Sequence, residues 1–395
     1  MKASRGPPGP WESTPGGRLN MDGSSATETT RLQALDNLRV FVIFLVVVLH
    51  GSICYMAYAP EWWYVLDPHR SMAFTYLVLL VDVPIMPAMF FLAGYFAFPS
   101  LAKRGAVRFV KDKLVRIGVP WAFGALVLAP PTAYMIYYSR NLPMSLATFW
   151  RTDFWGKAFQ QSVYWFLGVL LLLFLLTALA FALSRRFAAW KPEIRRPTWR
   201  LFALFVLTMS AGSLLIGVNH PLDQWSHVYV LVYQPARVPL YTGYFILGIV
   251  ACRQGWFTGQ GYRPAPFRWL ALCLAFGLLY LTGRIAFPAT GQAIAVTAAT
   301  VLLFNLFCFS SLMAGVALFQ ARLGPERFFR RSRARNSYGI YYLHPLFLYP
   351  LALIFVPLSL PLAVKAAAIV LLAYLASWGV SAAILTRLPG LRRMF

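Results

Sequence analysis

The sequence predicts an all-α, polytopic integral membrane protein, a bundle of about ten transmembrane helices. Hydrophobic residues make up 59% of its 395 residues and charged residues only 12%, which is too apolar for the surface of a soluble protein. Long apolar windows recur along the chain, and about 20 such residues suffice for a helix to cross a bilayer. Basic residues gather between alternate windows, as is typical of cytoplasmic loops.

The first 30 residues differ from the rest of the chain. They are rich in Pro, Gly, Ser and Thr and contain no apolar segment of a signal peptide, so we expect residues 1–30 to be a disordered cytoplasmic tail. Residues 31–395 then form one membrane domain. Its helices are expected at 38–58, 73–98, 117–138, 163–183, 201–218, 229–251, 268–286, 293–319, 338–356 and 362–385.

The basic residues predict the orientation of these helices. Most of the 36 Lys and Arg residues lie in the tail, after residue 386, or in the segments 99–116, 184–200, 252–268 and 320–337. This alternation places both termini in the cytoplasm. The net charge of +24 therefore reflects topology, and we expect no nucleic-acid partner. Aromatic residues near the opposite ends of the helices, such as Trp62, Trp63 and Tyr64, are expected mostly to form an interfacial belt.

The first helix contains an arginine and a histidine at a helical spacing. Arg39 and His50 are eleven residues apart, about three turns, so they share a face and lie roughly 16 Å apart along the axis. Asp36, one turn before Arg39, can fix its guanidinium group. A catalytic base deep in the membrane and a boundary arginine that snorkels beside a packing histidine explain this spacing equally well.

Three other ionisable residues fall within expected helices, where such groups are costly and commonly functional. Asp82 and Arg237 each lie among prolines, and could pair with each other or with a substrate. His344 follows Ser337 by seven residues, on roughly the same helical face. For His344, a packing role beside Pro345 is favoured by the residues alone.

A basic segment follows the second expected helix. At helical spacing, Arg104, Arg108 and Lys111 share a face and could grip the phosphates of a nucleotide-bearing donor. Contact with anionic lipids explains most of these charges equally well. The four cysteines show no metal-binding spacing, so we expect no metal site.

Four ordered motifs carry a resemblance to a known family. They are "LDNLRVFVIFLVVVLH", "MPAMFFLAGYF" followed by "KRGAVRFVKDKLVRIGVPW", "VYWFLGVLLLLF" and "NSYGIYYLH". With them, the sequence resembles the bacterial membrane-bound acyltransferases of the family-three type, and in tone its glucan succinyltransferases. Two departures are Ala93 before Gly94, where many members have serine, and the lack of an acidic residue between Gly168 and Leu176.

The resemblance implies a ten-helix enzyme of the bacterial cytoplasmic membrane. Such an enzyme would be an O-acyltransferase that moves an acyl group from a cytoplasmic acyl-CoA-type donor to a hydroxyl of a glycan, with no tightly bound cofactor. Arg39 and His50 match the family's motif positions, with His344 and Ser337 as weaker candidates. The other function class we consider is a proton-coupled transporter or flippase, since intramembrane Asp82 and Arg237 would suit one.

Overall fold

The computed structural model confirms the all-α polytopic class. It describes residues 22–395 except 157, 190–192, 259, 288–292 and 322–330. Within these residues, ten helical segments are long and apolar enough to cross a membrane. The only sheet in the described part of the chain is a two-stranded antiparallel hairpin, in which His227 lies opposite Val232.

The elements follow one another with short connections. The α-helices are α1 (Asp22–Ile53), α2 (Met72–Arg104), α3 (Ala106–Lys113), α4 (Val119–Phe123), α5 (Ala129–Ser139), α6 (Leu146–Thr152), α7 (Trp165–Leu183), α8 (Arg185–Ala188), α9 (Trp199–Gly217), α10 (Val238–Arg253), α11 (Pro266–Ala286), α12 (Ile294–Ala321), α13 (Arg331–Phe355) and α14 (Leu362–Val380). The strands are β1 (Ser226–Val228) and β2 (Leu231–Tyr233). Short 3-10 turns are η3 (Ser162–Tyr164), η4 (Pro235–Arg237) and η6 (Leu391–Arg393), and π turns are η1 (Leu114–Gly118), η2 (Gly124–Leu128) and η5 (Ser381–Leu385).

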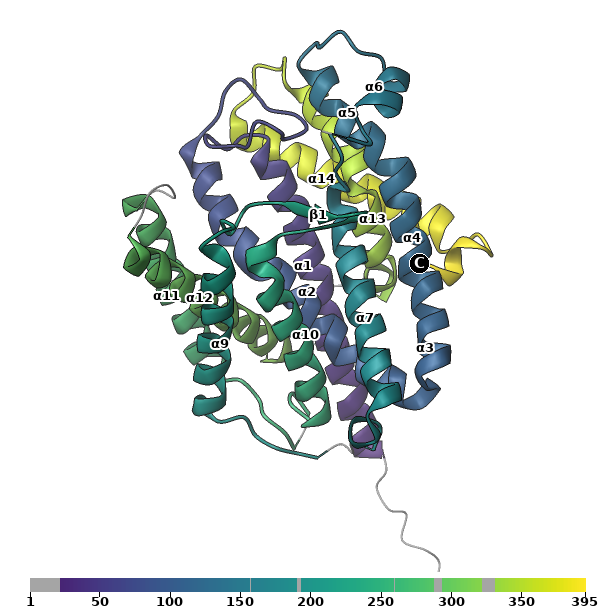
Figure 1. Cartoon of the computed structure of the whole chain (residues 1–395), viewed down its shortest axis with the longest axis vertical. Helices are drawn as coiled ribbons and strands as arrows, with labels where there is room; N and C mark the ends of the chain where they lie inside the picture. The colour runs from purple at the N-terminus through teal and green to yellow at the C-terminus, as the bar shows by residue number, and fades with distance from the viewer. Residues whose placement is uncertain (1–21, 157, 190–192, 259, 288–292, 322–330) are drawn as a thin grey trace, which may run out of the picture.

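Helix α1 rises through the middle of the bundle in Figure 1, from the end where the chain begins. Helices α11 and α12 lie on one flank, and the α3–α5 segment lies on the other. Residues 54–71, which join α1 to α2, and the α5–α6 region gather at the upper end. The bundle therefore has two distinct ends, one near the start of α1 and one near its finish.

Two glycines let α2 and α10 approach backbone to backbone. A Cβ atom added at Gly94 would lie 2.0 Å from the carbonyl oxygen of Phe245, and one at Gly248 would lie 2.1 Å from that of Phe91. Small residues at such contacts allow membrane helices to pack closely where the hydrophobic effect cannot drive association. The "LAGYF" motif thus has a packing role.

The segment from residue 106 to 139 is helical throughout, although two π turns interrupt its α-helical pattern. The expected loop at 99–116 was wrong in this respect, because α2 extends to Arg104 and α3 begins at Ala106. Gly105, with a φ of 74°, separates the two helices. Positive φ favours glycine, so the chain turns sharply here with little strain.

Two further boundaries differ from expectation. Residues 226–233, which overlap the start of the helix expected at 229–251, form the β1–β2 hairpin instead. Most of the predicted tail, residues 1–21, lies outside the described residues, and α1 begins at Asp22.

Candidate functional site

Two histidines from distant parts of the sequence meet inside the bundle. His50 of α1 and His344 of α13 have ring centroids 5.1 Å apart, and His344 Nε2 lies 3.3 Å from His50 Nδ1. His344 is fully buried, whereas His50 keeps part of its surface open. The structure therefore places His344 against the candidate base as its partner.

The hydrogen bonds around this pair determine which nitrogen holds each proton. His50 Nδ1 lies 2.7 Å from the carbonyl oxygen of Val46, and His344 Nδ1 lies 2.7 Å from that of Tyr341. A carbonyl oxygen only accepts, so in the neutral rings both Nδ1 atoms carry hydrogen. His344 Nε2 then accepts from His50 Nδ1–H. His50 Nε2 keeps an unprotonated lone pair, which is what a general base requires.

An indole ring covers the other side of His50. Trp63 stacks on the imidazole with a centroid distance of 5.7 Å and an interplanar angle of 10°. Trp63 is only 5% exposed, unlike Trp62 beside it at 46%. The expectation of an interfacial belt is therefore wrong for Trp63, because its loop folds inward over α1. We call residues 54–71 the Trp63 loop.

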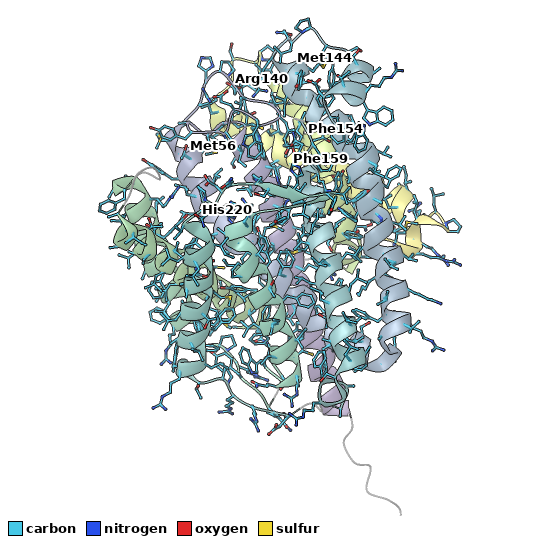
Figure 2. The ribbon with its side chains drawn as sticks, viewed as in Figure 1. Met56, Arg140, Met144, Phe154, Phe159 and His220 are labelled. Atoms are coloured by element: carbon cyan, nitrogen blue, oxygen red, sulfur yellow. The ribbon has the colours of Figure 1, made fainter. Side chains whose placement is uncertain are left out.

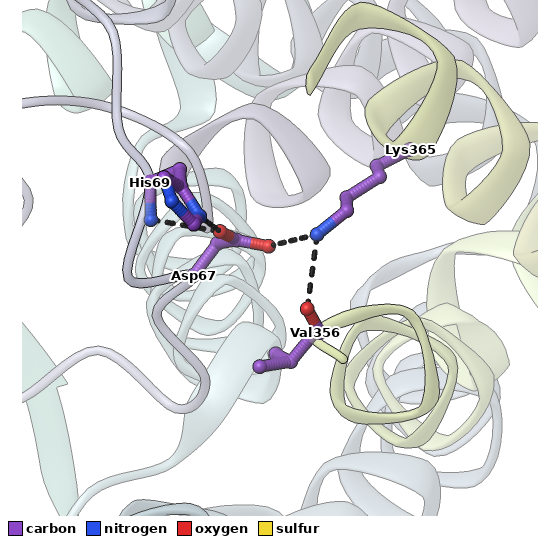
Figure 3. Close-up of polar contacts among 4 residues, drawn as sticks. All are labelled: Asp67, His69, Val356 and Lys365. Carbon is purple, nitrogen blue, oxygen red and sulfur yellow. Dashed lines mark hydrogen bonds and ion pairs between the residues drawn. The ribbon is translucent and has the colours of Figure 1, made fainter. Parts of the chain in front are cut away.

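A buried ion pair anchors the Trp63 loop to the last transmembrane helix. The ammonium group of Lys365 in α14 lies 2.9 Å from Asp67 Oδ2 and donates a second hydrogen bond to the carbonyl oxygen of Val356 (Figure 3). Both side chains are almost fully buried. Asp67 Oδ1 also accepts from the backbone N–H of His69. These contacts distribute the carboxylate charge over several donors and hold the loop in one position.

The α5 end of the bundle holds the same loop from another side. The Arg140 guanidinium donates to the carbonyl oxygens of Glu61 and Trp63, at 2.7 and 3.1 Å. The Ser139 hydroxyl donates to the carbonyl oxygen of Tyr64 at 3.0 Å. Arg140 lies at the upper end in Figure 2. The position of Trp63 over His50 is thus fixed by contacts from α5 and α14 together.

Arg39 lies near the opposite end of α1. Its guanidinium forms an ion pair with Asp36 at 3.0 Å, as the spacing predicts. Within the described residues, the buried Arg39 Nε and Asn37 Nδ2 have no hydrogen-bond partner. Buried donors are costly when unpaired, so this point of α1 is suited to an anionic or carbonyl group from outside the chain.

Asp82 and Arg237 pair with each other. Asp82 Oδ2 lies 2.6 Å from Arg237 Nη2, and the guanidinium also donates to the carbonyl oxygen of Leu222 and lies over the Phe304 ring. Arg237 is nearly buried. Of the two roles considered from the sequence, this geometry matches a structural ion pair between α2 and the start of α10.

The basic cluster is not one helical face. Arg104 ends α2, and the break at Gly105 removes it from the helix that holds Arg108 and Lys111. Arg104 instead pairs with Asp112 at 3.2 Å. Arg108 and Lys111 are exposed and show no ion pair among the described residues. No described contact joins any of the three to Arg39.

Ser337 lies inside α13 and not at its start, since that helix begins at Arg331. Ser337 is buried, one turn or more from any described contact with the histidine pair. Tyrosines of the same motif fix α13 in place. Tyr338, Tyr341 and Tyr342 donate to the carbonyl oxygens of Arg116, Val163 and Pro120. The "NSYGIYYLH" motif thus positions His344.

Cys54, at the end of α1, is unsuited to act as a nucleophile. Burial raises the pKa of its thiol to about 12, so the thiol stays protonated at neutral pH. Among the described residues, no group of three or more His, Cys, Asp or Glu side chains could hold a metal ion. The chemistry of the region therefore centres on His50.

Sequence reasoning found both histidines but missed Trp63, Asp67 and Lys365. Lys365 was visible only as a lysine at the edge of an apolar segment, and nothing in the sequence linked it to Asp67. Comparison with family models finds a match to the acyltransferase domain over residues 32–385, which includes His50, His344 and the four motifs. Comparisons with curated proteins and with solved structures found no match. The chain belongs to acyltransferase family three and is a multi-pass membrane acyltransferase.

Proposed function

We propose that this acyltransferase moves an acyl group from an acyl-CoA-type thioester to a hydroxyl of a cell-envelope or exported glycan. The observation that carries this proposal is the hydrogen bonding of His50, which leaves Nε2 with a free lone pair inside the bundle. The membrane is proposed to be the bacterial cytoplasmic membrane, with both termini on the cytoplasmic side, because the basic segments alternate along the chain.

In the proposed reaction, His50 Nε2 takes the proton of the acceptor hydroxyl while the hydroxyl oxygen attacks the thioester carbonyl carbon. A C–O bond forms, the C–S bond breaks, and the leaving thiolate takes the proton from His50. General-base catalysis of this kind contributes about 10² to 10⁴ in rate. His344 accepts from Nδ1–H of His50 throughout and keeps the ring in the required orientation.

The donor is proposed to enter from the Arg39 end of the bundle. Its anionic groups would meet the unpaired Nε of Arg39 and the exposed Arg108 and Lys111, while its thioester reaches His50 roughly 16 Å along α1. No tightly bound cofactor is needed for this chemistry. Anionic lipids remain the competing partners of Arg108 and Lys111.

The test uses purified full-length protein with radiolabelled acetyl-CoA or succinyl-CoA and a panel of hexose oligosaccharides. We expect His50→Ala to lower the transfer rate at least a hundredfold, while His69→Ala, which removes an exposed histidine, leaves it unchanged. Full transfer by His50→Ala would overturn the mechanism. Absence of thermal stabilisation by either acyl-CoA would overturn the donor class and favour a transporter.

Histidine can also act as a nucleophile, through an acyl-imidazole. An experiment with labelled donor and no acceptor separates this role from that of a base. Acid-stable label on wild-type protein, absent from His50→Ala, would show the covalent route.

A further inference from the structure

A groove opens at the upper end of the bundle, beside the Trp63 loop. Its volume is about 710 Å³, within the range of small-ligand sites. One wall is the end of α5 and the turn after it, and the other is the end of α13 and the residues that follow. Its lining includes Tyr134, Tyr138, Ser139, Asn141, Leu353 and Val356. We call it the Tyr138 groove.

The chemistry of the groove fits a neutral ligand with both apolar and polar surface. No charged side chain is among the described residues that line it, so it offers nothing to the phosphates of a nucleotide donor. Tyr138 is 56% exposed and presents an aromatic face, with the Tyr134 ring 6.2 Å away. The side chains of Tyr138 and Asn141 make no described hydrogen bond, so a phenol and an amide remain available to hydroxyl groups.

Both walls connect to the loop that covers His50. Ser139 of one wall donates to the carbonyl oxygen of Tyr64, the neighbour of Trp63. Val356 of the other wall accepts from Lys365, which in turn pairs with Asp67 (Figure 3). The Tyr64 ring packs at 4.3 Å on that of Tyr349, in the turn of α13 before the groove. The groove and the histidine pair therefore share one fixed framework.

The distance to the site limits what the groove can hold. Leu353 follows His344 by nine residues, which places this wall roughly 14 Å beyond the histidine along α13. A hydroxyl that reacts at His50 cannot lie in the groove at the same time. Other units of the same chain can lie there, since the groove is open to the surface at the end of the bundle where Arg140 and Met144 lie (Figure 2).

We infer that the Tyr138 groove binds neutral sugar units of an oligosaccharide acceptor, next to the unit that is acylated. The inference rests on the proposed function for the identity of the acceptor. A pyranose ring offers an apolar face for Tyr138 and hydroxyls for the Asn141 amide and the Tyr138 phenol. The groove would then select acceptors by chain length.

The experiment compares linear oligomers of glucose, galactose and mannose with two or seven units. Calorimetry measures their binding to purified wild-type, Tyr138→Ala, Asn141→Gly and Tyr58→Ala proteins, and labelled acyl-CoA measures transfer to them. Glycine at position 141 removes the amide and accepts the φ of 54° found there. Tyr58, 74% exposed and outside the groove, is the matched control.

We expect a heptasaccharide to bind wild type more tightly than its disaccharide. Tyr138→Ala and Asn141→Gly should weaken heptasaccharide binding and raise its KM by roughly two- to tenfold, with kcat and the disaccharide KM unchanged. Tyr58→Ala should have no effect. Equal binding of wild type and Tyr138→Ala, an equal effect of Tyr58→Ala, or no heptasaccharide binding at all would overturn the inference.

The two proposals fail in different ways. Transfer by wild type that is insensitive to Tyr138→Ala would leave the proposed function standing and remove the groove. Heptasaccharide binding that depends on Tyr138, without any transfer, would leave the groove standing as a sugar site and remove the proposed function.

Discussion

At the scale of single residues, the histidine pair assigns different roles to its two members. His344 gives its only described ring–ring hydrogen bond to His50 and has no exposed surface, so it is a positioning residue. We expect His344→Ala to lower kcat by about two- to tenfold, the effect of losing one hydrogen bond. His344→Gln, whose amide oxygen can accept from Nδ1–H, should keep most of the activity.

Initial rates at saturating donor, with protein amounts equalised by immunoblot of the membranes, check this expectation. A loss as large as that of His50→Ala would mean that His344 takes part in proton transfer itself.

The Asp67–Lys365 pair leads to a prediction about stability. Lys365→Met leaves a carboxylate buried without its partner, which typically costs about 3 to 5 kcal/mol of unfolding free energy. The double variant Asp67→Asn with Lys365→Met removes both charges and should recover most of that loss. Thermal unfolding in detergent measures both, with Lys103→Met, an exposed lysine, as the control. A wild-type midpoint for Lys365→Met would contradict a stabilising role.

Residues of this kind explain the limits of prediction from the sequence. His50 was visible because a histidine in an apolar helix is unusual, and Asp36 and Arg39 pair locally, one turn apart. Trp63 was not visible, because an aromatic residue near the end of a helix looks the same whether it faces the lipid boundary or turns inward. Only the path of its loop separates the two outcomes.

At the scale of elements, close contact between α2 and α10 depends on glycine. Gly94→Ala would place a methyl group against the Phe245 carbonyl oxygen, a backbone atom that cannot turn away. We expect this variant to separate the helices and to lower the amount of folded protein in the membrane severalfold. Gly379→Ala in α14, where a Cβ would meet nothing within 4 Å, is the matched control.

Size-exclusion chromatography in detergent measures the folded fraction of both variants. Equal elution profiles for the two would show that α2 and α10 can separate without loss of the fold.

Hydropathy predicted which elements exist, since each crossing needs its own apolar window. It failed at their limits for physical reasons. Helix α3 continues past the apolar residues, because lysine and arginine are good helix formers outside the membrane. Residues 226–233 include Val228, Val230 and Tyr233, whose side chains suit a hairpin as well as a helix, so composition alone favoured the wrong element.

At the scale of the whole molecule, the proposed orientation can be tested by chemical access. The natural cysteines are buried or half-buried, and replacing them with alanine gives a background for single new cysteines. A membrane-impermeant maleimide should label Asn141→Cys in cells with an intact cytoplasmic membrane. Lys111→Cys, at the other end of the bundle, should react only after that membrane is permeabilised. The reverse pattern would invert the topology and place the donor on the other side.

The buried ion pair also has a consequence for how the chain is assembled. Asp67 belongs to the first loop to be synthesised, and Lys365 belongs to the last transmembrane helix. A lysine one turn inside that helix resists entry into lipid, although its long side chain can reach the boundary until a partner is met. Insertion of α14 is therefore completed against a surface made nearly 300 residues earlier, as the 298-residue separation of the pair shows. A chain released before Lys365 is made has no such lock, so it leaves the Trp63 loop unclosed and exposes an unpaired carboxylate that quality-control proteases can recognise.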